Sequence, residues 1–335
     1  MTIEATARAH PNMALVKYWG KRDEQLMLPS TGSLSMTLDE FPTTTTVRLR
    51  TDGGPDVLEL NGVVAGGDAA ARVTRFLDLV RERAGSEARA IVRSRNEVPT
   101  GAGLASSASG FAALATAASA VYELPQDTTS RSRLARRGSG SACRSIIDRM
   151  AVWHAGTDDE SSYAERIDAP ELAMVVVVLD SGRKKVSSRE AMRLTAATSP
   201  FAAAWRESTA RTLEDMLAAC REGDVTRIGE LAEVNALRMH AVIQSTSPSV
   251  RYLSGRSLDV FDGIESLRAD GIGVWGTADA GPNVVAITRP ADAAAVAEAL
   301  TSHGEVRVVR PGPGARLLED PADAVPAATA GSEAR

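Results

Sequence analysis

The chain has 335 residues, of which 44% are hydrophobic and 24% are charged; these fractions are ordinary for a globular protein, and the length predicts two lobes. Its 38 basic and 43 acidic residues give a net charge of −5, which argues against a nucleic-acid partner. Two distant cysteines predict no disulfide framework and favour the cytoplasm. The lack of a signal-peptide core and of any apolar run near ~20 residues predicts no membrane partner.

The first half of the chain alternates strand and helix patterns. Beta-branched residues predict a strand at 41–50, and a second strand at 56–60 can pair with it. Apolar residues at helical spacing predict a helix at 68–83, and a strand follows at 88–95. A Gly-rich turn then leads into an alanine-rich helix at about 104–122.

The second half has its own order of elements. An unbroken apolar run at 173–180 predicts a buried strand. The segments that follow are predicted to be helices at 200–222, 225–240, 257–269 and 291–302 and strands at 272–276, 283–288 and 305–309. Without the extra helices this order is β-α-β-β-α-β, a ferredoxin-like arrangement.

Three ranges follow from this order of elements. We predict an N-terminal lobe at 1–180 and a C-terminal lobe at 181–318. The remainder, 319–335, is rich in alanine, proline and acidic residues, and we expect it to be a disordered tail.

The strongest local signal is the sequence PTGAGLASSASG at 99–110, where a strand passes into a helix. Gly101 and Gly103 allow the backbone to approach a ligand, and the helix start offers free N–H groups and a positive dipole end to phosphate. Ser106 and Ser107 add hydroxyls for a phosphate or for the ligand shell of Mg²⁺. The competing interpretation is a tight turn before a small-residue packing helix, because the segment lacks the GxxxxGK[ST] pattern.

A second signal is RRGSGSACR at 136–144. Arg144 carries a planar guanidinium, which grips a carboxylate or a phosphate with two bonds, and Ser139 and Ser141 can each donate one more. The competing interpretation is a solvated basic helix end, which is how we interpret Arg131, Arg133, Arg136 and Arg137.

Three shorter segments carry charges that suit phosphate or acid–base chemistry. Lys17 and Lys21 in KYWGK suit phosphate, although lysines also protect exposed edge strands. Asp279 in GTADAGPN lies between two predicted strands and is a candidate general base, unless it only forms the turn. KKVSSR at 184–189 follows the buried strand, where functional loops are common, and a mobile basic loop is the alternative.

Taken in combination, these segments resemble a known family. AHPNMALVKYWGK at 9–21 resembles the N-terminal motif of the diphosphomevalonate decarboxylases, and PTGAGLASSASG is similar to their form of the phosphate loop of the GHMP kinase superfamily. RRGSGSACRS, VSSREAM and TADAGPN resemble further family motifs, in the right order. The resemblance covers about 8–310. It implies an α+β, two-lobed GHMP kinase fold with an N-terminal ribosomal-protein-S5-like lobe and a C-terminal ferredoxin-like lobe.

The resemblance also implies a reaction in the mevalonate pathway of isoprenoid biosynthesis. In this family, ATP phosphorylates the tertiary 3-hydroxyl of (R)-5-diphosphomevalonate. The 3-phosphate then leaves as the carboxylate departs as CO₂, which gives isopentenyl diphosphate, ADP and phosphate. We therefore expect a small-molecule substrate, ATP as co-substrate with Mg²⁺, and a homodimer.

Roles for individual residues are carried over from the family motifs. Asp279 is expected to orient or deprotonate the 3-hydroxyl, Lys17 to stabilise the alkoxide or the leaving phosphate, and Arg144 to grip the carboxylate. The residues implied in substrate binding, beside Arg144, are Tyr18, Trp19, Gly20, Lys21, Arg72, Ser139, Gly140, Ser141, Ala142, Cys143, Ser188 and Arg189. Those implied in ATP binding are Ser94, Asn96, Gly101, Gly103, Ser106, Ser107, which is also the implied metal ligand, and Lys185.

The sequence departs from the family pattern in three places and leaves alternatives open. Ala278 stands where the family usually has Phe, Pro11 where Val or Thr is usual, and 30–32 (STG) replaces a segment that often carries Asn. A mevalonate 3-kinase or a phosphomevalonate decarboxylase of the same fold is one alternative. A non-catalytic small-molecule sensor is another, but a sensor is expected to have lost Asp279 or Lys17.

Overall fold

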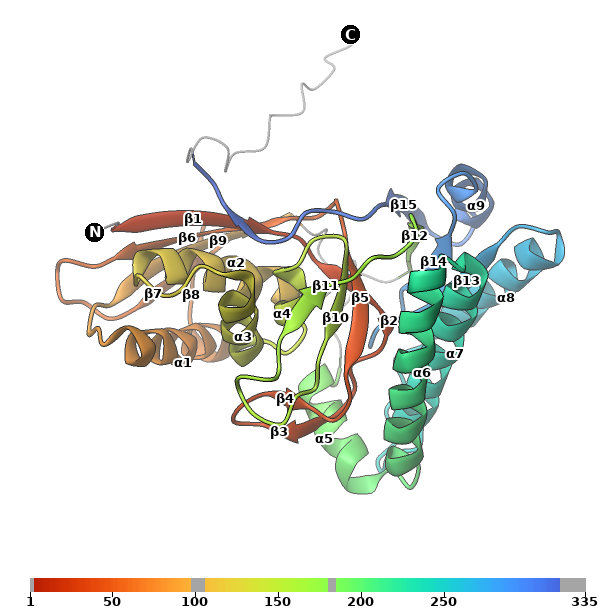
Figure 1. Cartoon of the computed structure of the whole chain (residues 1–335), viewed down its shortest axis with the longest axis horizontal. Helices are drawn as coiled ribbons and strands as arrows, with labels where there is room; N and C mark the ends of the chain where they lie inside the picture. Colours follow the sequence, from red (N-terminus) through yellow and green to blue (C-terminus); the bar gives the residue numbers. More distant parts are fainter. Residues whose placement is uncertain (1–2, 98–105, 180–184, 320–335) are drawn as a thin grey trace, which may run out of the picture.

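The computed structural model describes residues 3–97, 106–179 and 185–319. Two of the residues implied in ATP binding, Gly101 and Gly103, lie outside these ranges, as does all of the predicted tail except Glu319. Within the described residues, no helix combines the length and the apolar character needed to cross a membrane. The chain forms two α+β lobes side by side (Figure 1), which confirms the predicted fold class.

The first lobe is built on a six-stranded sheet. Its threonine-rich strand β6 lies near the middle, because β-branched side chains suit a pleated surface with both edges paired. All neighbours are antiparallel except β7 and β9, which are parallel. In spatial order the strands are β16 (Arg316–Leu317), β1 (Glu4–Ala9), β6 (Thr43–Leu49), β9 (Ala90–Asn96), β7 (Val57–Leu60) and β8 (Val63–Ala65).

Four helices cover this lobe. The alanine-rich helix α2 packs against β1 and β6, where small side chains let the helix approach the sheet closely, and most of its residues are buried. α1 and α3 lie next to each other on the same side of α2, and α4 is a single turn (Figure 1). The helices are α1 (Gly67–Ala84), α2 (Ser106–Val121), α3 (Thr128–Gly138) and α4 (Ala142–Ser145).

A second sheet faces the other lobe. Its edge strand β2 is buried along its whole length, because residues of β2 share one apolar core with Met216 and Ile228 on the helices of the second lobe. The strands in spatial order are β11 (Ala164–Arg166), β10 (Met150–Trp153), β5 (Ser33–Thr37) and β2 (Asn12–Val16); a hairpin of β3 (Lys21–Asp23) and β4 (Leu28–Pro29) stands apart.

The second lobe has one antiparallel sheet with helices on both faces. The sheet order is β13 (Val274–Thr277), β14 (Val284–Thr288), β12 (Ala173–Val178) and β15 (Glu305–Val309). Met174 and Val176 of β12 join the core under α6 and α7, whereas Val175 and Val177 join the core under α8 and α9, so the strand is apolar throughout. The helices are α5 (Ser188–Thr198), α6 (Ala202–Glu222), α7 (Val225–Gln244), α8 (Gly255–Ala269) and α9 (Ala293–Leu300).

The strand pairing in the sheet of the second lobe indicates where one lobe ends and the other begins. Because β12 pairs with β14 and β15, we propose that the boundary lies between β11 and β12, ahead of residue 180. The connection from β12 to α5 passes through residues outside the described ranges.

Candidate active site

A cavity of about 320 Å³, which we call the inner cavity, lies where the two lobes meet. Lys17, directly after β2, Arg144 in α4 and Asp279 in the loop between β13 and β14 all line it. These are the three residues predicted to be catalytic. They come from distant parts of the sequence and from both lobes, and the fold brings them to one wall.

Lys17 is held from three directions. Its Nζ donates to the carbonyl oxygen of Ala14 at 2.7 Å and to Asp279 Oδ1 at 2.8 Å. Its backbone N–H donates to Asn235 Oδ1 of α7, also at 2.8 Å. The side chain is only 1% exposed, and desolvation lowers its pKa, which the charge of Asp279 opposes. Lys17 is therefore an oriented cation with little freedom to move.

Asp279 presents its carboxylate to the cavity. Its side chain is 27% exposed, far more than that of Lys17, so the open side of the ion pair belongs to the carboxylate. His240 of α7 lies buried nearby, and desolvation, followed by the charge of Lys17, lowers its pKa to about 4. The imidazole is therefore neutral at neutral pH and adds no charge to the site.

Arg144 is buried and most of its donors are already used. Its Nε donates to Ser35 Oγ at 2.9 Å and lies 3.3 Å from Asn12 Oδ1. Its Nη1 donates to Ser33 Oγ at 2.5 Å and its Nη2 to Asn12 Oδ1 at 3.1 Å. A guanidinium has five N–H groups, so among the described contacts one N–H on each Nη stays available. These contacts fix the fork in one orientation.

Three further cations line the same cavity: Lys21 in β3, Arg72 in α1 and Arg189 in α5. Desolvation, and next the charge of Arg189, lower the pKa of Lys21 to about 8. The same two causes lower the pKa of Arg72 to about 10. Cations crowded in this way, with little negative charge between them, form an anion site.

The turn at Gly140 shapes the wall between these cations and Arg144. A Cβ at Gly140 would lie 2.8 Å from Cε1 of Tyr18, closer than real side chains come, so only glycine fits beside the tyrosine ring. The hydroxyl of Tyr18 is buried without a hydrogen-bond partner in the described part of the chain. Such a group is costly to leave unpaired, and Tyr18 is one of the residues that line the inner cavity.

A second cavity of about 260 Å³, the side cavity, lies between the six-stranded sheet and helices α1 and α2. Apolar walls from residues such as Leu58 and Phe111 meet a polar edge that includes Ser94 and Asn96. Ser107 lines both the side cavity and the inner cavity, and its Oγ lies 3.4 Å from Ser139 Oγ. Two ligands, one in each cavity, would therefore meet at Ser107.

Most of the predicted ligand-binding residues line these cavities. Lys185 is exposed ahead of α5 and lines neither, and Ser106 opens α2. Gly20, Ala142 and Cys143 do not line the inner cavity, although Cys143 Sγ donates at 3.0 Å to the carbonyl oxygen of Gly140, which does line it. The residues predicted to bind substrate that line the inner cavity are Tyr18, Trp19, Lys21, Arg72, Ser139, Gly140, Ser141, Arg144, Ser188 and Arg189.

Sequence reasoning missed two groups of residues. Ser33, Ser35 and Asn12, which orient Arg144, went unnoticed, although the alternation of Ser33 and Ser35 along one strand is a sign that both face the same way. The apolar lining was missed as well, and it includes the methionines Met27, Met192 and Met239.

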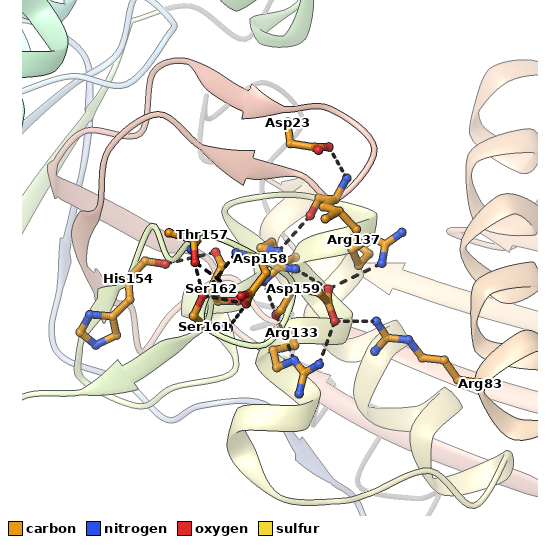
Figure 2. Close-up of polar contacts among 12 residues, drawn as sticks. Asp23, Arg83, Arg133, Arg137, His154, Thr157, Asp158, Asp159, Ser161 and Ser162 are labelled. Atoms are coloured by element: carbon orange, nitrogen blue, oxygen red, sulfur yellow. Dashed lines mark hydrogen bonds and ion pairs between the residues drawn. The ribbon is translucent and has the colours of Figure 1, made fainter.

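The carboxylate of Asp159 forms ion pairs with four arginines, of which Figure 2 labels Arg83, Arg133 and Arg137. Its Oδ2 accepts from Arg83 at 3.1 Å and from Arg133 at 2.9 Å. Its Oδ1 accepts from Arg136 at 2.5 Å and lies 3.6 Å from Arg137 Nη1. The loop that carries Asp159 is thus tied to the C-terminal half of α3.

The prediction that Arg131, Arg133, Arg136 and Arg137 form a solvated helix end is wrong for Arg136. Its side chain is fully buried, and it also donates to the carbonyl oxygens of Ser162 and, at 3.1 Å, of Leu26. Leu26 belongs to the turn of the β3–β4 hairpin, which carries Lys21. Arg136 therefore joins the Asp159 loop to that hairpin, and the reason is a partner that local sequence does not reveal.

Models of known protein families match most of the chain. A family model described as the diphosphomevalonate decarboxylase-like N-terminal domain matches residues 9–164, and one described as the mevalonate 5-diphosphate decarboxylase C-terminal domain matches residues 174–308. The chain is 36% identical to the diphosphomevalonate decarboxylase of Candida albicans over 300 residues, which cover 84% of this chain and 83% of that protein.

Solved structures resemble the whole fold. One, described as "MDDEF in complex with MVAPP, AMPPCP and Magnesium", is similar with a TM-score of 0.91 and 42% identity, covering 95% of this chain and 99% of that chain. Mevalonate diphosphate decarboxylase from Staphylococcus aureus is similar with a TM-score of 0.91 and 38% identity, over the same shares of the two chains.

Proposed function

The chain belongs to the diphosphomevalonate decarboxylase family and acts as an ATP-dependent decarboxylase of (R)-5-diphosphomevalonate, and we propose that its own Asp279, Lys17 and Arg144 carry out the chemistry. The products are isopentenyl diphosphate, ADP, phosphate and CO₂, in the mevalonate pathway of isoprenoid biosynthesis. The observation that carries the assignment of roles is that these three side chains line one cavity whose other wall is cationic.

The substrate has two anionic ends, and the inner cavity has a place for each. We assign the diphosphate to Lys21, Arg72 and Arg189, with the hydroxyls of Tyr18 and Ser141 as further donors. The carboxylate belongs at the other end, against the two free N–H groups of Arg144. Held at both ends, the substrate has its 3-hydroxyl near Asp279, and this orientation lowers the entropy lost in the reaction.

Phosphorylation comes first. The carboxylate of Asp279 accepts a hydrogen bond from the 3-hydroxyl and takes its proton, while the oxygen forms a bond to the γ-phosphorus and the bond from that phosphorus to ADP breaks. Lys17, 2.8 Å from Asp279, lies close enough to stabilise negative charge on the oxygen. The imidazole of His240 is neutral at neutral pH, so it adds no charge beside the pair of Lys17 and Asp279.

Decarboxylation follows. The C–O bond to the 3-phosphate breaks, the bond between the carboxylate carbon and its neighbour breaks, and the electron pair of the latter forms the new double bond. Lys17 stabilises the departing phosphate. Arg144 holds the carboxylate in line, and its interaction with that charge is lost as CO₂ forms.

The described residues fit ATP and Mg²⁺. The side cavity offers apolar walls for a flat base and the polar groups of Ser94 and Asn96 at its edge, and Ser107 stands where it opens to the inner cavity. No cluster of three acidic, histidine or cysteine side chains suited to a metal occurs among the described residues, so Mg²⁺ would be held by phosphate oxygens and the Ser107 hydroxyl. When bound, the ion neutralises phosphate charge.

Location and assembly are further parts of the proposal. Both cysteines, Cys143 and Cys220, are free and buried, which supports a reducing compartment such as the cytoplasm. We expect a homodimer. Light scattering during size-exclusion chromatography tests this, and a mass near that of one chain, 35.2 kDa, would contradict it.

The proposed substrate is tested by direct comparison. The protein is incubated with ATP, Mg²⁺ and each of mevalonate, its 5-phosphate and its 5-diphosphate, and ADP and CO₂ are measured. We expect the 5-diphosphate to be preferred, because the cationic wall offers more donors than one phosphate needs. Equal turnover of the 5-phosphate would support a phosphomevalonate decarboxylase. Formation of ADP without CO₂ would support a 3-kinase, and the absence of both products would support a non-catalytic sensor.

A further inference from the structure

A third cavity, of about 360 Å³, adjoins the inner cavity and shares Lys21, Arg72 and Arg189 with it. We call it the outer cavity. Its charged lining consists of six cations and one carboxylate, Glu24; the cations are Lys21, Arg72, Arg75, Arg137, Arg189 and Arg193.

Four elements build the outer cavity. α1 contributes Arg72 and Arg75, which are three residues apart and so project from the same face of the helix. Arg137 comes from the last turn of α3, which lies between α1 and the β3–β4 hairpin (Figure 1). The hairpin supplies Lys21 and Glu24, and α5 completes the wall.

The carboxylates in and near the outer cavity, Glu24 and Asp159, already form ion pairs with arginines. Glu24 forms two contacts with Arg193, one of them 2.6 Å between Arg193 Nε and Glu24 Oε1. Arg137 has only a share of Asp159, which three other arginines also contact. Arg75 is exposed to the cavity and has no hydrogen-bond or ion-pair partner in the part of the chain that the structure describes.

The outer cavity has more positive charge than the substrate and Glu24 can neutralise. The proposed function places the substrate diphosphate on Lys21, Arg72 and Arg189. Of the six cations, three then remain, and Glu24 offsets one of them, so the outer cavity keeps a net charge of +2. Like charges held together are unfavourable unless an anion lies among them.

We propose that the outer cavity is a second anion site, which binds a free, doubly charged oxyanion of the inorganic phosphate class through Arg75 and Arg137 while the substrate occupies the inner cavity. This inference rests on the proposed function, because that function fixes where the substrate diphosphate lies. The lowered pKa values of Lys21 and Arg72 agree with it, since desolvation and neighbouring arginines are their two largest causes. Arg75 is the diagnostic residue, because it serves no other described contact.

The test is a calorimetric titration of the full-length protein with inorganic phosphate, at constant ionic strength, with and without saturating diphosphomevalonate and without ATP. We expect phosphate to bind in both conditions. Arg75→Gln should weaken that binding about tenfold or more, the loss typical of one charged hydrogen bond. Arg75→Lys should retain most of it, and Arg221→Gln, at an exposed arginine near the end of α6, should not change it.

Two results would overturn the proposal: phosphate binding that saturating diphosphomevalonate abolishes, or binding that Arg75→Gln leaves as in the wild type. The KM of Arg75→Gln for diphosphomevalonate should stay within about threefold of the wild type, since a single exposed charge changes binding little. A separate measurement tests the proposed function: if the wild-type protein releases no CO₂, that function is wrong. In that case the titration of the ligand-free protein still decides whether Arg75 binds an anion.

Discussion

Lys17 and Asp279 are 262 positions apart in the sequence, yet Lys17 Nζ and Asp279 Oδ1 are 2.8 Å apart in the structure. Lys17 belongs to the first lobe and Asp279 to the second, so this ion pair crosses the contact between the lobes. The pair is correctly formed only when the lobes are held in register, and β2 packed against α6 and α7 provides that register.

The first prediction concerns Asn235, which accepts the backbone N–H of Lys17 at 2.8 Å. Asn235→Ala leaves that buried N–H without a partner, which costs about 1–3 kcal/mol. We expect the free energy of unfolding to fall by that amount and kcat to fall with it, because Lys17 moves. Thr209→Val is the control, since it removes only a 3.4 Å contact from Asn235 Nδ2 and should have a smaller effect. Wild-type stability in Asn235→Ala would refute the role.

Arg144→Lys should fail although the charge is kept. Lysine cannot satisfy Ser33, Ser35 and Asn12 while also presenting two parallel N–H groups to a carboxylate. Loss of one charged hydrogen bond of about 3 kcal/mol corresponds to roughly a hundredfold in kcat/KM. The measurement is kcat/KM for diphosphomevalonate at saturating ATP, and values near those of the wild type would reject this role for Arg144.

The dependence of kcat/KM on pH should show the loss of the proton from Lys21. Desolvation, and next the charge of Arg189, place its pKa at about 8 in the ligand-free protein, below the ordinary 10.5. As pH rises through about 8, the ammonium loses its proton and its attraction for the diphosphate, so kcat/KM should decline while kcat changes less. In Lys21→Arg the decline should disappear below pH 9, because a guanidinium stays charged. A decline that persists in Lys21→Arg belongs to another group.

Asp159→Asn tests the arginine cluster as a structural unit. The change leaves the buried guanidinium of Arg136 without its carboxylate, and breaking a buried ion pair costs roughly 3 kcal/mol. Thermal unfolding should show a clear fall in Tm. Asp158→Asn is the matched control, because Asp158 is an exposed neighbour whose hydrogen bonds to described residues all stay within its own loop. Equal Tm values for the two variants would show that the cluster adds no stability.

Elements with a strong local period could be predicted from the sequence. The helix expected at 68–83 is α1 (Gly67–Ala84), and the strand expected at 305–309 is β15. Apolar spacing is set within a few residues, so it can be recognised without knowing the fold. The candidate catalytic residues could be named only because a resemblance to known motifs joined short segments that, singly, had ordinary explanations.

What could not be predicted depends on partners far away in the sequence. Arg136 has the same local pattern as a solvated helix end, and only Asp159 and the carbonyl of Leu26 make it a buried residue. Ser33 and Ser35 look like any polar strand until Arg144, more than 100 positions later, donates to both. The outer cavity is similar, because its cations come from four separate elements.

We propose that Asp279 acts in the phosphorylation step, and the substitution Asp279→Asn separates this role from one in decarboxylation. The change keeps the size of the side chain but removes the charge that orients the hydroxyl and accepts its proton. General-base contributions run about 10²–10⁴-fold, so we expect kcat to fall by that factor with ATP affinity unchanged. Asp270→Asn, at an exposed carboxylate after α8, is the control.

The decisive measurement is a single-turnover reaction of Asp279→Asn in which ADP and CO₂ are quantified in the same sample. Because phosphorylation precedes decarboxylation, we expect both products to appear late and together, in equal amounts. If ADP forms at the wild-type rate while CO₂ does not appear, Asp279 acts in decarboxylation and its proposed role in phosphorylation is wrong.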